Sequence, residues 1–209
     1  MSVNTDKVRS IIGDIAAVII EQKQYLSDLD QAIGDGDHGF NMARGFEAVM
    51  KKLKEAPGAD IGEVLKTVAM TLISNVGGAA GPLYGSLFLK ASGVAKGLTE
   101  MDLSAFVPVL KEGILGVQAR GKAELGDKTM IDVLLPMLES IEKDNAAGLS
   151  GKEAFANAEK IAAECMEKTR DIIAKKGRAS YLGERSIGHI DPGATSSYLM
   201  ISTINKALA

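Results

Sequence analysis

Three aspartates crowd into eight residues near the start of the chain, within the stretch LDQAIGDGDHGFNMARGF (residues 29–46). They are Asp30, Asp35 and Asp37; glycines separate them and His38 follows at once. Carboxylates this close repel one another unless one takes up a proton or a cation neutralises them. Oxygen donors suit Mg²⁺ or Ca²⁺ better than zinc. The stretch therefore predicts a site for a hard divalent cation, and the alternative is a solvated turn whose aspartates cap the next helix.

The spacing excludes an EF-hand loop, which needs a bidentate glutamate at its twelfth position. A frame that begins at Asp28 puts Gly39 there, and a frame that begins at Asp35 puts Phe46 there. Magnesium fits better than calcium, because Mg²⁺ is commonly held by a few carboxylates together with substrate phosphates. For His38 the spacing leaves two interpretations open, an ion-pair or cap partner and a residue with a chemical role.

Two further segments are rich in glycine. SNVGGAAGPLYGS (residues 74–86) contains no G-x-G-x-x-G motif and follows no strand, so it is no dinucleotide fingerprint. It can expose backbone N–H groups to a phosphate at a helix start, or it can serve close helix packing. GVQARGKAELGDKTM (residues 116–130) approaches a P-loop twice, but Ala123 replaces the hydroxyl residue in one frame and Asp127 interrupts the other. Neither frame follows a strand, so we reject a P-loop.

A third loop, HIDPGATSS (residues 189–197), opens the last helix. Asp191 can cap that helix, and Pro192 suits its first turn. Arg178 and Arg185 lie in the preceding loop, where each can screen phosphate charge or remain solvated.

The elements that must position these residues are helices. Apolar residues recur at helical spacing, and cap-like residues such as Asn4, Asp60 and Ser150 precede several of the runs. We expect eight helices, at 5–27, 39–54, 60–75, 81–96, 102–121, 129–144, 150–176 and 192–208. Short connections imply antiparallel neighbours, and the one long loop, 177–193, invites a functional interpretation. The fold class is therefore an all-α, single-domain antiparallel bundle over residues 1–209.

Composition narrows the function classes. A net charge of −3 argues against a nucleic-acid partner, which normally requires a clustered basic surface. No apolar run approaches the ~20 residues of a membrane helix, and we expect no signal peptide. The single cysteine, Cys165, cannot form an intrachain disulfide, which favours a cytoplasmic location.

Taken together, four stretches resemble the nucleotide-binding subunit of dihydroxyacetone kinase: LDQAIGDGDHGFNM, SNVGGAAGPLYG, GDKTM and IDPGA, in this order. The resemblance covers essentially the whole chain. It implies an antiparallel eight-helix barrel with a nucleotide, ADP or ATP, held at one rim through two Mg²⁺ ions.

Residue by residue, the resemblance implies that Asp30, Asp35 and Asp37 are the metal ligands. It also implies a set of nucleotide contacts: His38, Gly39, Phe40, Asn41, Gly78, Ala79, Gly121, Met130, Arg178, Asp191, Pro192 and Gly193. No catalytic base is expected on this chain; a base would come from the partner subunit.

The length of the chain resembles the split, phosphotransferase-system-dependent arrangement of the family rather than the long single-chain kinase. In the split arrangement ADP acts as a resident coenzyme. A phosphohistidine on a phosphotransfer partner recharges it, and the γ-phosphoryl passes to dihydroxyacetone on a substrate-binding subunit. The enzyme would then be a phosphoenolpyruvate–glycerone phosphotransferase, active only with its partner subunits.

Three alternatives remain beside this one. The chain could be the nucleotide domain of another small-substrate kinase, such as one acting on fatty acids with a carrier protein. It could be a nucleotide-sensing adaptor for a transcription regulator. A calcium-binding structural bundle is disfavoured because both EF-hand frames fail.

Overall fold

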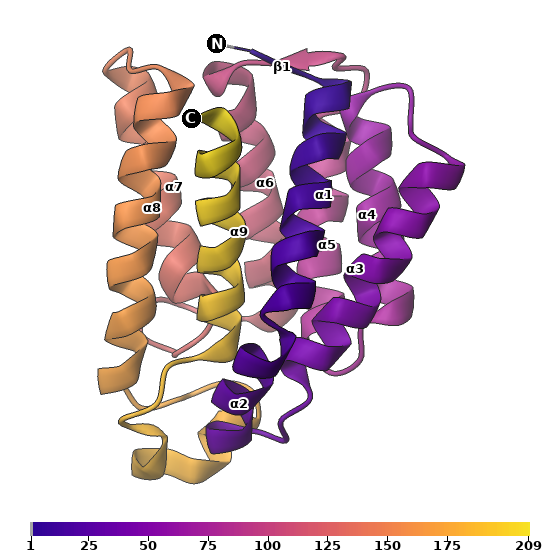
Figure 1. Ribbon diagram of the computed structural model, residues 1–209. Coiled ribbons are helices and arrows are strands. Elements are labelled where there is room, and N and C mark those ends of the chain that lie inside the picture. Colours follow the sequence, from indigo (N-terminus) through magenta and orange to yellow (C-terminus); the bar gives the residue numbers. More distant parts are fainter. Residues whose placement is uncertain (1) are drawn as a thin grey trace.

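The computed structural model describes residues 2–209, and nine α-helices lie in that part of the chain. Eight of them form a closed ring (Figure 1). Around the ring the order is α1 (Thr5–Glu21), α3 (His38–Glu55), α4 (Ile61–Asn75), α5 (Ala80–Val94), α6 (Leu103–Gly121), α7 (Ile131–Ala146), α8 (Gly151–Lys168) and α9 (Pro192–Leu208). The last helix packs against the first, so the ring is complete.

Neighbouring helices in the ring run in opposite directions, as short connections require. The ninth helix, α2 (Lys23–Ile33), does not join the ring but lies across one end of it (Figure 1). We call this end the rim. The end of α9 lies at the other end of the barrel, beside the start of α1. The expected all-α class and eight-helix antiparallel barrel are thus confirmed.

Local cap signals predicted several helix starts correctly. Asn4 accepts the backbone N–H of Lys7 at 2.9 Å. Ser150 and Glu153 form a reciprocal capping box at the start of α8. Pro192 occupies the first turn of α9. These residues satisfy N–H groups that a helix start otherwise leaves free, which is why the sequence alone locates them.

The helix expected at 5–27 is wrong, because the chain breaks at Gln22 and a second helix continues to Ile33. Ile19 and Leu26 are both fully buried on either side of the break, seven residues apart. That spacing equals two helical turns, so the apolar pattern runs through the break without revealing it. The consequence is that Asp30 belongs to a helix rather than to a loop.

Three other expectations about secondary structure also need correction. The helix expected at 150–176 ends at Lys168 and is followed by a 3₁₀ turn, η1 (Thr169–Asp171). The loop expected at 177–193 contains a further 3₁₀ segment, η2 (Arg178–Ser186). Two strands of two residues, β1 (Val3–Asn4) and β2 (Glu100–Met101), pair antiparallel although no strand was expected. Strands this short carry no alternating pattern that a sequence could show.

Among residues 2–209 no helix combines the length and apolar character needed to cross a bilayer.

Candidate functional site

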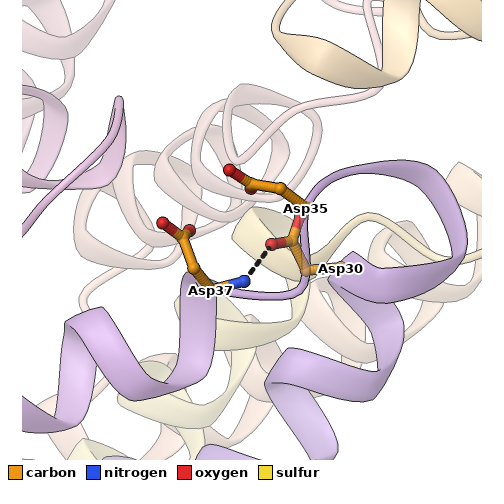
Figure 2. A group of neighbouring side chains, drawn as sticks. All are labelled: Asp30, Asp35 and Asp37. Atoms are coloured by element: carbon orange, nitrogen blue, oxygen red, sulfur yellow. Dashed lines mark hydrogen bonds between the residues drawn. The ribbon is translucent and has the colours of Figure 1, made fainter.

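The three aspartates converge at the rim. Asp30 lies in the last turn of α2, and Asp35 and Asp37 lie in the link between α2 and α3. One carboxylate oxygen from each lies within 4.8 Å of the other two. Figure 2 shows the three side chains directed toward a common space. A set of three oxygen donors at this separation matches the chemistry that Mg²⁺ prefers, so the residues fit such an ion.

Asp30 also organises the link that carries the other two. Its Oδ2 accepts the backbone N–H of Asp37 at 2.9 Å (Figure 2). It also accepts the backbone N–H of His38 at 3.2 Å. Burial raises the pKa of the Asp30 carboxyl, the two N–H donors oppose that rise, and the neighbouring carboxylates add to it. A divalent cation would relieve the crowding of negative charge that remains.

Two glycines let the chain take this path. Gly36 has φ +76°, a left-handed conformation that side chains rarely adopt. Gly39 is buried where α3 crosses α2, and a Cβ atom there would overlap the main-chain carbonyl oxygen of Lys23. The glycines of the acidic stretch therefore serve both a turn and a close helix approach.

Positive charge reaches the aspartates from a distant segment. Arg178, at the start of η2, forms an ion pair with Asp35 at 2.8 Å. Further basic residues line the cavity beside them: Arg120, Lys128, Lys175 and Lys176. The negative charge of the acidic stretch is thus balanced in part by residues that follow it by about 90 to 145 positions in the sequence.

The aspartates border an open cavity of about 860 Å³ at the rim. Because neighbouring helices alternate in direction, α3, α5, α7 and α9 all begin at this end (Figure 1). Their first residues, His38, Ala80, Ile131 and Pro192, all line the cavity. The start of α5 has no side-chain cap, so backbone N–H groups remain available there. At α3 and α7 the first N–H groups are already donated, that of His38 to Asp30 and that of Ile131 to the Thr129 hydroxyl. Free N–H groups and the positive helix-dipole ends favour an anion such as phosphate.

A hydrogen-bonded cluster of hydroxyls lies beneath the aspartates. His38 Nε2 and Ser196 Oγ are 3.0 Å apart, and Tyr84 bonds both Ser196 at 2.7 Å and Ser197 at 2.9 Å. Burial lowers the pKa of His38 to about 4 and raises the pKa of Tyr84 to about 12. Both side chains are therefore neutral near pH 7, and His38 does not add a positive charge to the site.

Asp191 caps α9 and lies against the same cavity. Its Oδ2 accepts the backbone N–H of Ala194 at 2.7 Å. Burial raises the pKa of the Asp191 carboxyl to about 7, while the Ala194 N–H opposes the rise. The predicted cap is confirmed, and the group is poised to be charged or neutral close to physiological pH.

The structure brings most of the expected nucleotide contacts together. The expected metal ligands and nine of the expected contacts line the cavity: Asp30, Asp35, Asp37, His38, Gly78, Ala79, Gly121, Met130, Arg178, Asp191, Pro192 and Gly193. Gly39, Phe40 and Asn41 do not line it. Gly39 packs on α2, Phe40 is 47% exposed, and Asn41 is buried where it accepts a hydrogen bond from Arg44 at 2.7 Å.

Sequence reasoning missed several residues at the site. Among Tyr84, Ser196 and Ser197 the two serines gave one available signal, since serine is mostly exposed and two adjacent serines stand in a helix expected to pack in the core. Lys128 gave none, because its partners lie 41 to 61 residues further along the chain.

A family model for the DAK2 domain matches residues 32–206. The chain belongs to the DAK2 domain family. The resemblance inferred from the four motifs is thereby confirmed.

The DAK2 relatives of similar length are named as kinase subunits. The chain is 43% identical to the "PEP-dependent dihydroxyacetone kinase, ADP-binding subunit DhaL" of Escherichia coli strain K12, with 99% of each chain covered. It is 45% identical to the "PTS-dependent dihydroxyacetone kinase, ADP-binding subunit DhaL" of Lactococcus lactis, with 95% of each covered. A longer relative, rat "Triokinase/FMN cyclase", is 32% identical, and the chain spans 34% of it.

Solved structures share the fold. The native dihydroxyacetone kinase of C. freundii gives a TM-score of 0.75 at 23% identity over 95% of this chain and 34% of that one. The same kinase in complex with AMP-PNP and Mg²⁺ gives a TM-score of 0.76 at 22% identity over 99% of this chain and 34% of that one. The DAK2 barrel here thus corresponds to about one third of a longer kinase chain.

Proposed function

We propose that this protein is the nucleotide-carrying subunit of a phosphotransferase-dependent dihydroxyacetone kinase, formed by a single domain over residues 1–209. Adenine nucleotide, as ADP and ATP, binds in the rim cavity, and Asp30, Asp35 and Asp37 hold two Mg²⁺ ions against its phosphates. The observation that carries the proposal is the convergence of three carboxylates and four helix starts on one cavity. The names of the full-length relatives supply the substrate class.

The arrangement suits phosphoryl transfer, which depends on positioning and charge neutralisation more than on covalent help from the protein. When bound, the metal ions would neutralise the charge on the transferring phosphoryl group. The chain's own part is to hold the phosphates with backbone N–H groups at the start of α5, from Gly78 and Ala79. Neutral His38, bonded to Ser196, leaves its other ring nitrogen free for a hydrogen bond.

We assign no group of the cavity as a base on a sugar hydroxyl, because the candidates already have other tasks. His38 is neutral but buried with a pKa of about 4, and Asp191 is the cap of α9. We therefore place the base and the dihydroxyacetone site on a partner subunit that docks at the rim. A phosphohistidine partner restores the γ-phosphoryl to ADP without the nucleotide leaving. These reactants and the single cysteine favour the cytoplasm.

Reconstitution tests this proposal. The chain is incubated with Mg²⁺, ADP, a dihydroxyacetone-binding subunit and a phosphohistidine donor, and dihydroxyacetone phosphate is measured. We expect turnover only when all components are present, with nucleotide needed in amounts equal to the protein. Robust turnover by the isolated chain with ATP would contradict the split arrangement. An inactive complete mixture would contradict the substrate class.

A further inference from the structure

The link between α6 and α7 carries a lysine that is almost completely enclosed. Lys128 is 1% exposed, although lysine side chains normally reach solvent. Its Nζ lies 2.7 Å from the carbonyl oxygen of Thr169, 2.7 Å from that of Ser186 and 2.6 Å from that of His189. A fourth carbonyl oxygen, that of Ile172, lies at 3.2 Å. An ammonium group has three protons, so the three short contacts use all of them and the fourth oxygen gains from the charge alone.

All four oxygens belong to one stretch, residues 169–190, which we call the cap segment. It connects α8 to α9 and lies across the rim beside α2, orange to yellow in Figure 1. Charge-assisted hydrogen bonds are stronger than neutral ones, and Lys128 makes several to residues from both ends of the cap segment. One side chain thus ties the whole segment to the barrel.

The cap segment has further attachments to the rest of the chain, among them the Arg178–Asp35 ion pair at 2.8 Å and Ile190, which is buried in the main core. Its small apolar cluster with α2 contains three buried residues, Ile33, Ala174 and Ala179. Lys175 donates its backbone N–H to the Asp127 carbonyl oxygen at 3.1 Å, and its exposed side chain lies 3.7 Å from the Asp127 carboxylate. Much of the remaining hydrogen bonding is within the segment, such as Gly188 to Arg170. Without Lys128 the segment would keep these separate contacts but lose the side chain that bonds both of its ends.

The backbone at this position is strained as well. Lys128 has φ +61°, in the left-handed region that residues with a side chain rarely occupy. Such a conformation persists where the surrounding structure compensates for it. Burial lowers the pKa of Lys128, and Asp191 and Asp171 oppose that fall. A glycine would avoid both costs and an apolar side chain would avoid the burial of charge, so the ammonium has a role that outweighs them.

The position of Lys128 joins two walls of the rim cavity. Thr129 and Met130, next to it in the chain, line one wall. The cap segment supplies Arg178 and leads directly into Asp191 in the other wall. We propose that Lys128 is a positioning residue whose ammonium, bound in a cage of four carbonyl oxygens, holds the cap segment closed over the nucleotide cavity. The nucleotide part of this inference rests on the proposed function, whereas the attachment of the cap segment does not.

The chain offers a matched control. Lys122 is the one other residue besides glycine with positive φ among residues 2–209, at +50°, but its side chain is exposed. Lys128→Met and Lys122→Met therefore change the same residue in the same backbone region, and differ in the loss of the buried ammonium. Trypsin reports on the cap segment because Lys175, Arg178 and Arg185 lie within it.

We expect trypsin to cleave the cap segment of the Lys128→Met protein at least about tenfold faster than wild type, while Lys122→Met matches wild type. Circular dichroism on the same samples should show the helices retained. Equal cleavage in both variants would overturn the proposal. If Lys128→Met does not fold, Lys128→Gly, which relieves the backbone strain, is compared with Lys122→Gly in the same assay.

Chemical rescue separates the charge from the space that the side chain fills. In Lys128→Gly, n-butylammonium can replace the missing side chain and its charge, whereas n-butanol replaces only the volume. We expect millimolar n-butylammonium to restore protection from trypsin and n-butanol to leave cleavage fast. Equal effects of the two compounds would contradict the role of the ammonium.

Titration of Mg-ADP by calorimetry completes the test. Wild type and Lys122→Met should bind with equal affinity, and Lys128→Met at least about tenfold more weakly, a difference of about 1.4 kcal/mol. An open cap segment with unchanged affinity would refute the positioning role. If wild type itself does not bind Mg-ADP, the proposed function fails, while the protease comparison still decides whether Lys128 holds the cap segment.

Discussion

The three aspartates differ in their structural roles. Asp30 accepts two backbone N–H groups and shapes the link to α3, so it has a structural task as well as a place in the cluster. Asp35 and Asp37 are exposed, and neither side chain caps a helix. Substitution of Asp37 therefore tests binding without removing a contact that supports the fold, and substitution of Asp35 removes only its ion pair with Arg178.

Asp35→Ala or Asp37→Ala should weaken Mg-ADP binding at least about tenfold, about 1.4 kcal/mol, because the cation loses a carboxylate ligand. Calorimetry measures the affinity, and far-UV circular dichroism on the same samples should show an unchanged helical fold. Asp28→Ala is the matched control, since Asp28 is exposed on the same helix as Asp30 and lies outside the cluster. An affinity equal to that of the control would remove the aspartates from the nucleotide site.

Asp191 gives a prediction about pH. Its carboxyl has an ordinary pKa of 3.8 when unfolded and a pKa of about 7 when buried in the fold. The folded protein therefore holds the proton more tightly, and the wild type loses stability as pH rises from about 4 to 7. Asp191→Asn keeps an oxygen for the Ala194 N–H but carries no charge.

We expect the melting temperature of metal-free Asp191→Asn to match wild type near pH 4 and to exceed it near pH 8, by a few degrees for every kcal/mol recovered. The recovered free energy of unfolding is at most roughly 4 kcal/mol, from a shift of about three pKa units. Thermal melts in chelator across this range measure it. A difference between the two proteins that does not change with pH would show that the buried carboxyl is not the cause.

At the scale of the elements, the contact of α3 with α2 sets the position of the acidic link. Gly39 is required there because a Cβ atom would overlap the Lys23 carbonyl oxygen. Gly39→Ala should lower the free energy of unfolding by about 2 kcal/mol and weaken nucleotide binding, because α3 must shift away from α2.

Gly93 is the matched control for this prediction. It lies in α5, and beyond the backbone of its own helix nothing lies within 4 Å of the place that an added methyl group would take, so Gly93→Ala should stabilise the protein by about 0.5 kcal/mol. Urea unfolding of both variants measures the two effects. A Gly39→Ala protein as stable as Gly93→Ala would show that the close approach of the two helices is not needed.

The elements also show which structural features can be predicted from sequence. Asn4, Ser150 and Pro192 mark helix starts through bonds and torsions within three residues of themselves, so they were found. The break at Gln22 was missed because the apolar spacing continues across it. The acidic stretch could be proposed as a cation site from residue type and spacing, and the structure brings its three carboxylates together. The role of Lys128 could not be predicted from sequence, because it depends on carbonyl groups that only the folded chain brings close to the ammonium.

At the scale of the whole molecule, the alternation of helix direction decides where the site lies. Closure of the ring by α1 and α9 requires an even number of alternating helices, so four helices begin at the same rim. That rim gathers the positive ends of four helix dipoles beside three carboxylates. The barrel thus provides donors for phosphate and ligands for a cation at one place.

Neither the four helix starts nor the three carboxylates suffice alone to bind a nucleotide. The carboxylates would repel a diphosphate, and at about 4 Å with an effective dielectric constant near 20 that repulsion is about 4 kcal/mol for each pair of charges. A divalent cation converts this repulsion into attraction. Nucleotide binding must therefore depend on magnesium, and not only tolerate it.

The most direct test is calorimetric titration of ADP into the nucleotide-free protein, with Mg²⁺ and then with a chelator in its place. The account predicts one ADP bound for each chain in Mg²⁺, and an affinity lower by about 100-fold or more in chelator, equivalent to about 2.7 kcal/mol. Binding of equal strength in the two buffers would contradict it, because the three aspartates could then not be the groups that hold the nucleotide through a metal ion.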